Sequence, residues 1–271
     1  MEPLRGDILV VGLGVSGEAA AAYCASRAAE GDAVCVTVVD TGDSGQLRQR
    51  AERLRALGAT VIIGSRALDG AYDLAIASPG IPPHAPLMAA ARAAAREVVS
   101  EIEFAYRRSS APWIAVTGTN GKTTVTSLIG HVLAGSGVSA RVVGNIGTAA
   151  ISTVDEVGPA GVLVAEVSSF QLALTSRFHP RVSVLLNITP DHLDWHGSME
   201  AYASDKGQVF ARQDMDDTAV IDADDPGAAA FITGVRSRGI RVMPVSGNSV
   251  PGGGAGVGTD GVLTLDTPAG R

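Results

Sequence analysis

The feature that most constrains the fold is an apolar run at residues 113–116, followed by a glycine-rich loop and a helical segment at 125–133. The loop reads Gly118-Thr119-Asn120-Gly121-Lys122-Thr123-Thr124. In a strand–loop–helix unit of this kind, backbone N–H groups and the helix N-terminus point at phosphate oxygens. Lys122 can reach the β- and γ-phosphates, and the Thr123 hydroxyl can bind Mg2+. The unit predicts an α/β domain that binds a nucleoside triphosphate.

The loop departs from the common phosphate-binding pattern at one position. Val116 stands where that pattern has its first glycine, so the first glycine here is Gly118. The alternative is a glycine-rich turn before a surface helix that carries an exposed lysine. The order of strand, Gly-Lys-Thr and helix favours the phosphate loop.

Strand-like and helical segments alternate along most of the chain. In the first hundred residues we expect strands at 7–11, 34–39, 60–63 and 73–77, and helices at 15–27, 46–57 and 86–95. After a polar break at 107–112, strand patterns recur at 138–143, 161–165, 182–187 and 218–221. Alternation of this kind predicts parallel sheets covered by helices. We therefore expect an α/β protein with a Rossmann-like domain over residues 1–108 and a P-loop ATPase-type domain over residues 112–271.

The C-terminal stretch is rich in glycine at 251–256 and resumes a strand-like alternation at 262–265. We interpret it as half of a hairpin without a closing element. This interpretation makes the second domain incomplete at Arg271.

A second glycine-rich turn, Gly12-Leu13-Gly14-Val15-Ser16-Gly17, follows the first expected strand. Asp40 ends the second strand, close to where a dinucleotide fold places its ribose-binding acid. Three interpretations stay open: an NAD(P) site, a tight turn that needs glycine for steric reasons, or a site for another diphosphate at the helix N-terminus.

Three further motifs follow expected strands, at the edge where open α/β sheets bind ligands. Ser78-Pro79-Gly80 is by itself more typical of a simple turn. Glu166 is placed where a nucleotide-binding domain holds a carboxylate for Mg2+. The loop Asn187–Asp194 contains His192 between two aspartates, which suits metal or phosphate binding. Lys206 lies beside Asp205 on an expected helix, where such a pair is ordinarily solvated, so local chemistry does not single it out.

Composition excludes several classes of function. With 46% hydrophobic and 18% charged residues, the chain can bury sizeable cores. A net charge of −7 without a basic cluster argues against nucleic-acid or membrane binding. Cys24 and Cys35 form no disulfide or zinc pattern, the start lacks signal-peptide features, and no apolar run reaches the roughly 18 residues of a membrane span. A cytoplasmic location is expected.

Taken together, the motifs resemble the Mur ligases of peptidoglycan synthesis. Gly118–Thr124 is similar to the ATP loop of that family, and Asn187–Asp194 is similar to its histidine-bearing motif. Further matches are Gly12–Gly17, Ser78–Ile81, Gly144-Asn145-Ile146-Gly147 and Glu166–Leu172. These motifs occur in family order across most of the chain.

The resemblance implies an ATP-dependent ligase. The member with the most similar motifs joins D-glutamate to UDP-N-acetylmuramoyl-L-alanine and uses ATP and Mg2+. ATP would phosphorylate the substrate carboxylate, and the amine of D-glutamate would displace the phosphate through a tetrahedral intermediate. The resemblance also implies a monomer that binds neither nucleic acid nor membrane.

Residue roles follow from the resemblance at matching positions. Lys122 and the loop from Gly118 to Thr124 would hold ATP, and Thr123 and Glu166 would bind one Mg2+. His192 would help to bind a second Mg2+, and Lys206 matches a lysine that is carbamylated in the family. The implied catalytic residues are Lys122, His192 and Lys206, and the implied metal ligands are Thr123, Glu166, His192 and Lys206. The implied substrate-binding residues are Val15, Ser16, Thr41, Ser78, Pro79, Gly80, Asn145, Ser168 and Gln171.

The family also has a C-terminal domain that binds the incoming amino acid, and this domain is not found before Arg271. The family's asparagine-bearing helix is not found either. The resemblance therefore implies a fragment in which ligation is absent or very slow. Two alternatives remain at this stage: an NAD(P)-dependent oxidoreductase that uses Gly12–Gly17 and Asp40, and an inactive nucleotide-binding fragment.

Overall fold

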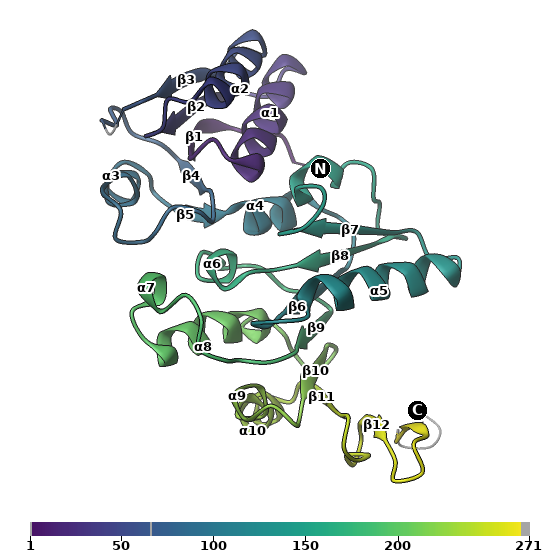
Figure 1. The fold of residues 1–271 in the computed structure, drawn as a ribbon. Coiled ribbons are helices and arrows are strands. Elements are labelled where there is room, and N and C mark those ends of the chain that lie inside the picture. Colours follow the sequence, from purple (N-terminus) through teal and green to yellow (C-terminus); the bar gives the residue numbers. More distant parts are fainter. Residues whose placement is uncertain (1, 66, 267–271) are drawn as a thin grey trace. The chain divides into compact units, whose positions relative to one another are not determined.

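The computed structural model describes residues 2–65 and 67–266, and the chain divides into two compact units (Figure 1). The N-terminal unit contains the residues up to Ser110 together with Thr148–Glu156 and Leu174–Ser176. The central unit contains Ala111–Gly147, Val157–Ala173 and the residues from Arg177 onward. The predicted domain 112–271 extends over residues 267–271, which lie outside the described residues.

The N-terminal unit is a five-stranded parallel sheet in the order β3-β2-β1-β4-β5. This is the doubly wound order of dinucleotide-binding folds. Its elements are β1 (Gly6–Val11), α1 (Val15–Ala29), β2 (Val34–Asp40), α2 (Gly45–Ala56), β3 (Thr60–Ile63), β4 (Leu74–Ala77), α3 (Pro86–Ala94), β5 (Val98–Ser100) and α4 (Glu101–Arg108). The 3-10 helix η1 (Ala150–Thr153) also belongs to this unit.

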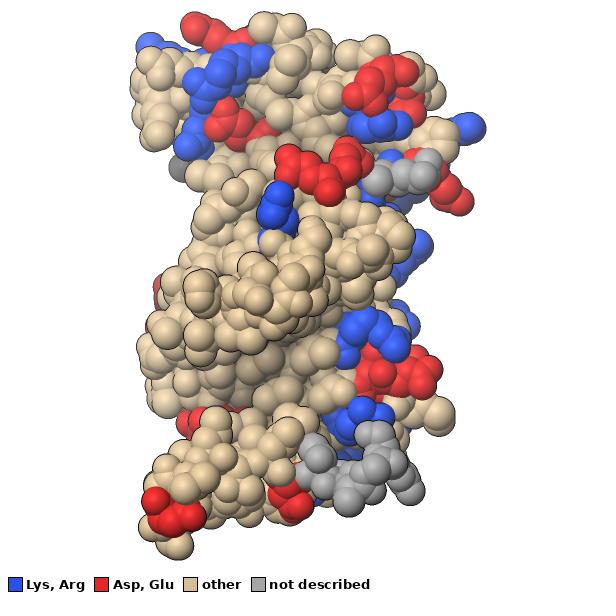
Figure 2. All heavy atoms as spheres, turned by 90° about the vertical axis from the view of Figure 1, so that its right-hand side faces the viewer, with Lys and Arg blue, Asp and Glu red and all other residues tan. Residues whose placement is uncertain are grey.

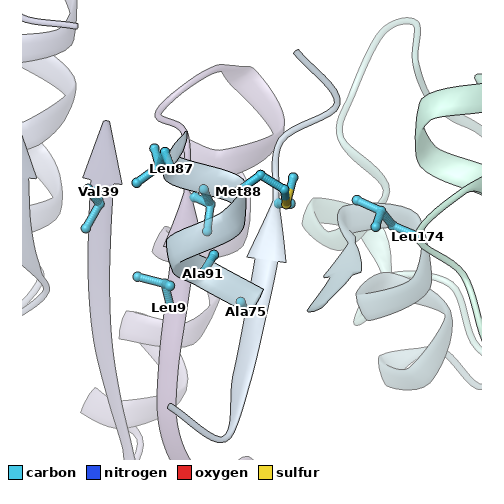
Figure 3. Packing of buried hydrophobic residues seen from close by; sticks show 9 residues of the cluster. Leu9, Val39, Ala75, Leu87, Met88, Ala91 and Leu174 are labelled. Carbon is cyan, nitrogen blue, oxygen red and sulfur yellow. The ribbon is translucent and has the colours of Figure 1, made fainter. Parts of the chain in front are cut away.

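Part of this unit's core lies between α3 and the sheet (Figure 3). Leu87, Met88 and Ala91 follow helical spacing on α3 and pack over β1 and β4, where Leu9 and Ala75 are fully buried. Burying a side chain as large as Leu87 or Met88 contributes about 1.5–3 kcal/mol to the stability of the unit. The packing therefore holds the C-terminal ends of the strands, and the turns that follow them, in a fixed arrangement.

The central unit contains an eight-stranded sheet in the order β13-β12-β11-β10-β9-β6-β8-β7. Its first elements are β6 (Trp113–Thr117), α5 (Lys122–Gly135), β7 (Ala140–Gly144), β8 (Val162–Glu166), α6 (Ser169–Leu172), β9 (Val182–Leu185), α7 (Leu193–His196) and α8 (Met199–Gly207). They are followed by η2 (Gln208–Phe210), β10 (Thr218–Asp222), α9 (Pro226–Ala229), α10 (Phe231–Ser237), β11 (Arg241–Ser246), β12 (Ala255–Val257) and β13 (Leu263–Leu265).

The register of this sheet brings the predicted motifs to one edge. β6 lies between β8 and β9 and is parallel to both. Glu166 is paired with Val116 of β6 on one side and with Gly144 of β7 on the other. The loops that leave β6, β7, β8 and β9 therefore start side by side, at the carboxyl ends where such sheets bind ligands.

Helix α5 has an uncharged outer face. After Lys122 it contains no Asp, Glu, Lys or Arg, and Leu128 and Val132 are more than half exposed. A broad uncharged band crosses the middle of the face in Figure 2, which views the molecule from the side where α5 extends in Figure 1. The charge of this helix is therefore concentrated at its first residue, beside the glycine-rich loop.

The predicted α/β fold class is confirmed, but one expectation about the C-terminal stretch is wrong. Residues 263–265 form β13, which pairs antiparallel with β12, so the hairpin is complete. The Ala-Gly-Val of β12 carries little strand signal by itself, because the pairing strands on both sides supply its hydrogen bonds. Within the described ranges, no helix combines the length and apolarity that a bilayer span requires.

Candidate functional site

The glycine-rich loop of the central unit leads directly into α5. Gly118 has φ +153 and Gly121 has φ +81, a region that favours glycine. A Cβ on Gly118 would lie 3.0 Å from Leu186 Cβ, so the neighbouring strand end leaves little space. The first intrahelical bond runs from Val125 N–H to Gly121 O, 3.1 Å. The amides from Lys122 to Thr124 precede that bond and face the helix N-terminus, where they can bind an anion.

The first part of the loop is bonded to the loop that follows β9. Asn187 O accepts from Thr119 N–H at 2.9 Å, and Asn187 Oδ1 accepts from Asn120 N–H at 2.8 Å. Asn187 Nδ2 donates back to Asn120 O at 3.1 Å. The Thr119 hydroxyl accepts from Thr189 N–H and lies 3.0 Å from Tyr202 Oη. The amides of Thr119 and Asn120 therefore brace the loop, and the anion-binding amides lie further along.

The two lysines of the chain meet on one carbonyl oxygen. Among 21 basic Lys and Arg residues, only Lys122 and Lys206 are lysine. Lys122 Nζ donates to Gly118 O at 3.0 Å and to Thr119 O at 2.9 Å. Lys206 Nζ donates to the same Gly118 O at 2.8 Å. Both lysine amines are thus concentrated at the glycine-rich loop.

Lys206 is not the solvated surface residue that its neighbourhood in the sequence suggests. It is 2% exposed, and its Nζ lies 4.7 Å from the centroid of the Tyr202 ring. Burial, with a smaller contribution from the charge of Lys122, lowers the pKa of Lys206 to about 7. A substantial fraction of its amine is therefore neutral, and nucleophilic, near neutral pH.

Glu166 joins three strand ends in a hydrogen-bonded group. It is 2% exposed, and its Oε2 accepts from the Thr123 hydroxyl at 2.7 Å. Its Oε1 accepts from Asn145 Nδ2 at 2.9 Å. A carboxylate and a hydroxyl at the start of α5 offer the hard oxygen ligands that Mg2+ prefers. This donor set fits the predicted metal site.

His192 occupies an unusual backbone conformation on the loop after β9. Its φ is +51, the one positive value at a non-glycine residue in the described ranges. The imidazole is half exposed and its Nε2 lies 3.4 Å from Asp191 Oδ2. Left-handed backbone at a residue with a side chain is uncommon and is held by surrounding structure. The histidine and the carboxylate form a mixed nitrogen and oxygen donor pair.

Ser168 and Gln171 bond mainly to each other. They form a capping box on α6, in which Ser168 Oγ accepts from Gln171 N–H and Gln171 Oε1 accepts from Ser168 N–H. Gln171 Nε2 is buried and has no hydrogen-bond partner among the described residues. That N–H group leaves a donor available to a ligand, whereas the remaining polar atoms of the pair fix α6.

In the N-terminal unit, all six predicted substrate residues line one cavity of about 360 Å³. Ser78 Oγ donates to Gly12 O at 2.9 Å and ties the loop after β4 to the glycine-rich turn. A Cβ on Gly17 would lie 2.0 Å from that same Gly12 O, so this position requires glycine. The lining residues are Gly12, Gly14, Val15, Ser16, Asp40, Thr41, Ser78, Pro79, Gly80 and Ile81.

Asp40 is engaged by the protein backbone. Its Oδ2 accepts from Leu13 N–H at 2.6 Å, and its Oδ1 accepts from Gly42 N–H at 2.7 Å. Each carboxylate oxygen keeps a further lone pair that can accept from a ribose hydroxyl. The two bonds therefore give Asp40 a role in shaping the turn and do not decide between NAD(P) and another diphosphate.

Three residues without a predicted role belong to these sites. Asn187 and Tyr202 contact the glycine-rich loop of the central unit, and Ile81 lines the N-terminal cavity. Asn187 and Ile81 lie in the predicted motifs Asn187–Asp194 and Ser78–Ile81, whereas Tyr202 lies in none. A second cavity of about 280 Å³ shares Thr41, Gly80 and Ile81 with the first and extends to the start of α3. Asn187 had a signal, since it directly follows an apolar strand, but nothing near Tyr202 in the sequence indicates its partner.

Known proteins resemble both the sequence and the fold. The profile of the Mur ligase middle domain matches residues 116–251. The UDP-N-acetylmuramoylalanine–D-glutamate ligase of Pelotomaculum thermopropionicum is 44% identical over 239 residues, covering 86% of this chain and 51% of that protein. The protein of the same name from Frankia casuarinae is 44% identical over 233 residues, covering 85% and 48%. The chain spans about half the length of these curated relatives.

Two solved structures share the fold. The UDP-N-acetylmuramate:L-alanyl-gamma-D-glutamyl-meso-diaminopimelate ligase from Neisseria meningitides matches with a TM-score of 0.55 and 16% identity, covering 93% of this chain and 83% of that one. The UDP-N-acetylmuramate-alanine ligase from Thermotoga maritima matches with a TM-score of 0.50 and 21% identity, covering 90% and 53%. At these identities the likeness concerns architecture alone.

Proposed function

The chain belongs to the Mur ligase family of ATP-dependent ligases, and we propose that it serves the ligation of D-glutamate to UDP-N-acetylmuramoyl-L-alanine in peptidoglycan synthesis. Relatives of that name at 44% identity support this choice of substrate. We propose that the reaction takes place in the cytoplasm and that the protein is a monomer. The observation that carries the proposal is the meeting of Lys122, Lys206 and Glu166 around one glycine-rich loop.

The loop of the central unit would bind the triphosphate of ATP. The amides from Lys122 to Thr124 would bind phosphate oxygens, and Lys122 Nζ would exchange its two carbonyl partners for the β- and γ-phosphates. Thr123 and Glu166 would hold one Mg2+, and His192 with Lys206 would hold a second. Bound metal ions would neutralise the charge that crowds around the transferred phosphoryl group.

The reaction proceeds by two displacements. The γ-phosphoryl group passes to the carboxylate of UDP-N-acetylmuramoyl-L-alanine, which forms an acyl phosphate and ADP. The amine of D-glutamate attacks the acyl carbon, and a tetrahedral intermediate expels phosphate. A carboxylate is a poor electrophile, so phosphorylation supplies the leaving group. Asn145, Ser168 and Gln171 would orient the alanyl carboxylate, with Gln171 Nε2 as an available donor.

The cavity of the N-terminal unit would bind the UDP portion. Val15 and Ser16 open α1, where backbone N–H groups favour a diphosphate. Thr41 and Ser78–Gly80 line the same cavity and would contact the uridine.

We also propose that Lys206 is carbamylated. Its neutral amine would attack CO2, forming an N–C bond and releasing a proton, so that a cation becomes an anion suited to metal. The pKa of about 7, lowered by burial, supports this reaction near neutral pH. The chain has only two lysines, so 13C NMR after addition of 13C-bicarbonate should show a carbamate signal that Lys206→Arg removes and Lys122→Arg retains. A carbamate on the α-amino group would give a separate signal that both variants retain.

Calorimetry on the 271-residue chain tests the proposed substrate. UDP-N-acetylmuramoyl-L-alanine is expected to bind more tightly than NADH, and UDP alone should retain part of that affinity. Adding ATP and hydroxylamine should trap the acyl phosphate as a hydroxamate only when the UDP substrate is present. Tighter binding of NADH than of the UDP substrate would contradict the proposal.

A further inference from the structure

A second histidine of the central unit, His196, lies at the centre of a buried hydrogen-bonded group that the proposed reaction does not use. Its side chain is fully buried at the end of α7. Nδ1 lies 2.6 Å from Asp205 Oδ2 on α8, and Nε2 lies 3.0 Å from Ser169 Oγ on α6. We call Ser169, His196 and Asp205 the histidine anchor.

The partners determine the role of each ring nitrogen. The carboxylate of Asp205 can only accept, so Nδ1 carries the proton and donates to it. In the neutral ring Nε2 is then an acceptor and receives the hydroxyl hydrogen of Ser169. Burial lowers the pKa of His196, which favours this neutral form. The ring is therefore held in one tautomer and one orientation between two helices.

This anchor is connected to His192 through one turn of backbone. Helix α7 has four residues, too few to be stable without tertiary support. His196 N–H donates to His192 O at 3.1 Å, and Trp195 N–H donates to the same oxygen at 3.0 Å. Fixing the His196 ring therefore fixes the peptide of His192, whose backbone is in the left-handed region.

Aromatic packing reinforces the same link. The Phe170 ring stacks on His196, with centroids 5.4 Å apart and planes 11° apart. The same ring lies 4.8 Å from the imidazole of His192 and 4.7 Å from Trp195. Phe170 follows Ser169 on α6, and Asp205 precedes Lys206 on α8, so the group joins the segments that carry Glu166, His192 and Lys206.

We propose that His196 is a positioning residue: held by Asp205 and Ser169, it fixes His192 in the orientation that binds the second divalent cation. This inference rests on the proposed function, because it concerns the cation that His192 would bind with ATP. Partners that orient a metal-binding histidine from outside the ligand set typically change metal affinity by about 10–100-fold when removed. His196 would act less directly than such a partner, because its link to His192 runs through one turn of backbone.

The chain offers a matched control in the same unit. His179 Nε2 contacts Asp217 Oδ2, a buried carboxylate, just before β9 and β10 begin. This pair is at the opposite ends of the strands from the loop of His192. Replacing His179 removes a histidine–carboxylate contact of the same kind without touching α6, α7 or α8.

The experiment measures Mn2+ binding to the full 271-residue chain with the non-hydrolysable β,γ-imido analogue of ATP, by electron paramagnetic resonance of free Mn2+. The variants are Asp205→Asn, Ser169→Ala, His196→Ala, His196→Asn and the control His179→Ala. We expect two Mn2+ ions on the wild type, and a weaker site whose affinity falls about tenfold in Asp205→Asn and His196→Ala. His196→Asn keeps a donor near the Nδ1 position and should recover part of the loss. His179 lies with Asp214 and Asp217 in a separate group of potential metal ligands, so the control is read from the ions that depend on the nucleotide. His179→Ala should leave the affinities of those ions within twofold.

A second measurement does not depend on metal. Nitrogen-15 spectra of the five imidazoles should show His196 in one tautomer in the wild type and a mixture in Asp205→Asn. Unchanged Mn2+ affinities in folded Asp205→Asn and Ser169→Ala would overturn the positioning role, even where the melting temperature falls. A wild type that binds fewer than two Mn2+ ions with the ATP analogue would overturn the proposed two-metal function together with this inference.

Discussion

The two glycine-rich turns of this molecule are similar in sequence but differ in the charged side chains around them. Within the described chain, the cavity at Gly12–Gly17 is lined by no lysine or arginine, and its one carboxylate, Asp40, is bound by two backbone amides. The turn at Gly118–Lys122 collects both lysines of the chain and lies beside the buried carboxylate of Glu166. At the first turn, Arg50 donates to Leu13 O at 2.9 Å and is paired with Glu18, so its charge is compensated within the unit. The second turn has two lysine amines beside the loop.

This contrast distinguishes a site that only binds its ligand from a site suited to a chemical reaction. A diphosphate that is only anchored needs amides and hydroxyls around it, which a helix N-terminus supplies. A phosphoryl group that is transferred accumulates charge in the transition state, and preorganised cations stabilise that charge. The N-terminal unit therefore suits an anchor, and the central unit suits the reaction.

The largest expected effect on ligand binding comes from replacing Lys122, the first residue of α5, beside the second turn. Lys122→Ala should lower the affinity for the ATP analogue about 100-fold, because a charged hydrogen bond to phosphate contributes about 1.5–3 kcal/mol. UDP affinity should stay within twofold, since the N-terminal cavity does not contain this residue. Calorimetry with both ligands measures this, and unchanged ATP affinity would mean that the loop does not bind the phosphates.

A pH titration should sharpen the comparison at Glu101, a buried carboxyl of the N-terminal unit that has no cation beside it among the described residues. Burial raises its pKa to about 7, and Ile151 N–H donates to its Oε1 at 2.7 Å. The folded state then holds a proton that the unfolded state releases near pH 4.5, so stability falls as pH rises from about 4.5 to 7. The total loss is about 3 kcal/mol, and Glu101→Gln should abolish it.

Hydrogen exchange is the suitable probe for that titration. Both tryptophans, Trp113 and Trp195, belong to the central unit, so fluorescence does not follow the unit that contains Glu101. Amides of β1 and β4 report the N-terminal unit directly. The control Glu52→Gln changes an exposed carboxyl of the same unit and should leave the pH slope intact. Equal slopes in Glu101→Gln and the wild type would contradict the assignment.

Gly17→Ala tests whether the first turn needs its close backbone approach. The new Cβ would meet Gly12 O at 2.0 Å, so we expect the N-terminal unit to lose about 1–3 kcal/mol of stability. Gly14→Ala is the matched control, because no atom lies within 4 Å of a Cβ built there. Thermal unfolding that is equally affected by both substitutions would mean that the contact is not limiting.

The smallest expected effect is that of Asp40→Asn. One oxygen would be replaced by an NH2 group facing a backbone N–H, so one of the two bonds from Leu13 and Gly42 should be lost. We expect a loss of about 1 kcal/mol in the stability of the N-terminal unit, with NADH binding no weaker than in the wild type. A large loss of NADH affinity would show that Asp40 contacts a ribose after all.

Much of the fold could be predicted because its signals are local. Apolar runs followed by turns identified β1, β2, β4 and β6, and the helix after β1 begins at Val15 as expected. The helix after β6 begins at Lys122, three residues before the expected start at 125. β12 was missed because Ala-Gly-Val has weak strand propensity and is defined by its neighbours. β5 and α4 were also missed. The three residues of β5 are too few to show the alternation of buried and exposed residues that marks a strand.

Sequence patterns predicted the position of a site residue only where that residue directly follows an expected strand. Glu166, His192 and the residues around Ser78 could be placed at a sheet edge, because parallel strands bring their carboxyl ends together. The sequence alone thus determined two parallel sheets, two glycine-rich turns and the edges at which ligands bind. These follow from patterns within about ten residues.

Only the tertiary structure decided which of these residues touch. It buried Lys206 against Gly118 O, bound both oxygens of Asp40 to backbone amides, and enclosed His196 between Asp205 and Ser169. Apart from the local bond between Gly42 N–H and Asp40, each of these contacts joins loops or helices that are separate in the chain. Hydrogen bonding and desolvation depend on distance in space, and a local pattern of residues carries no information about that distance.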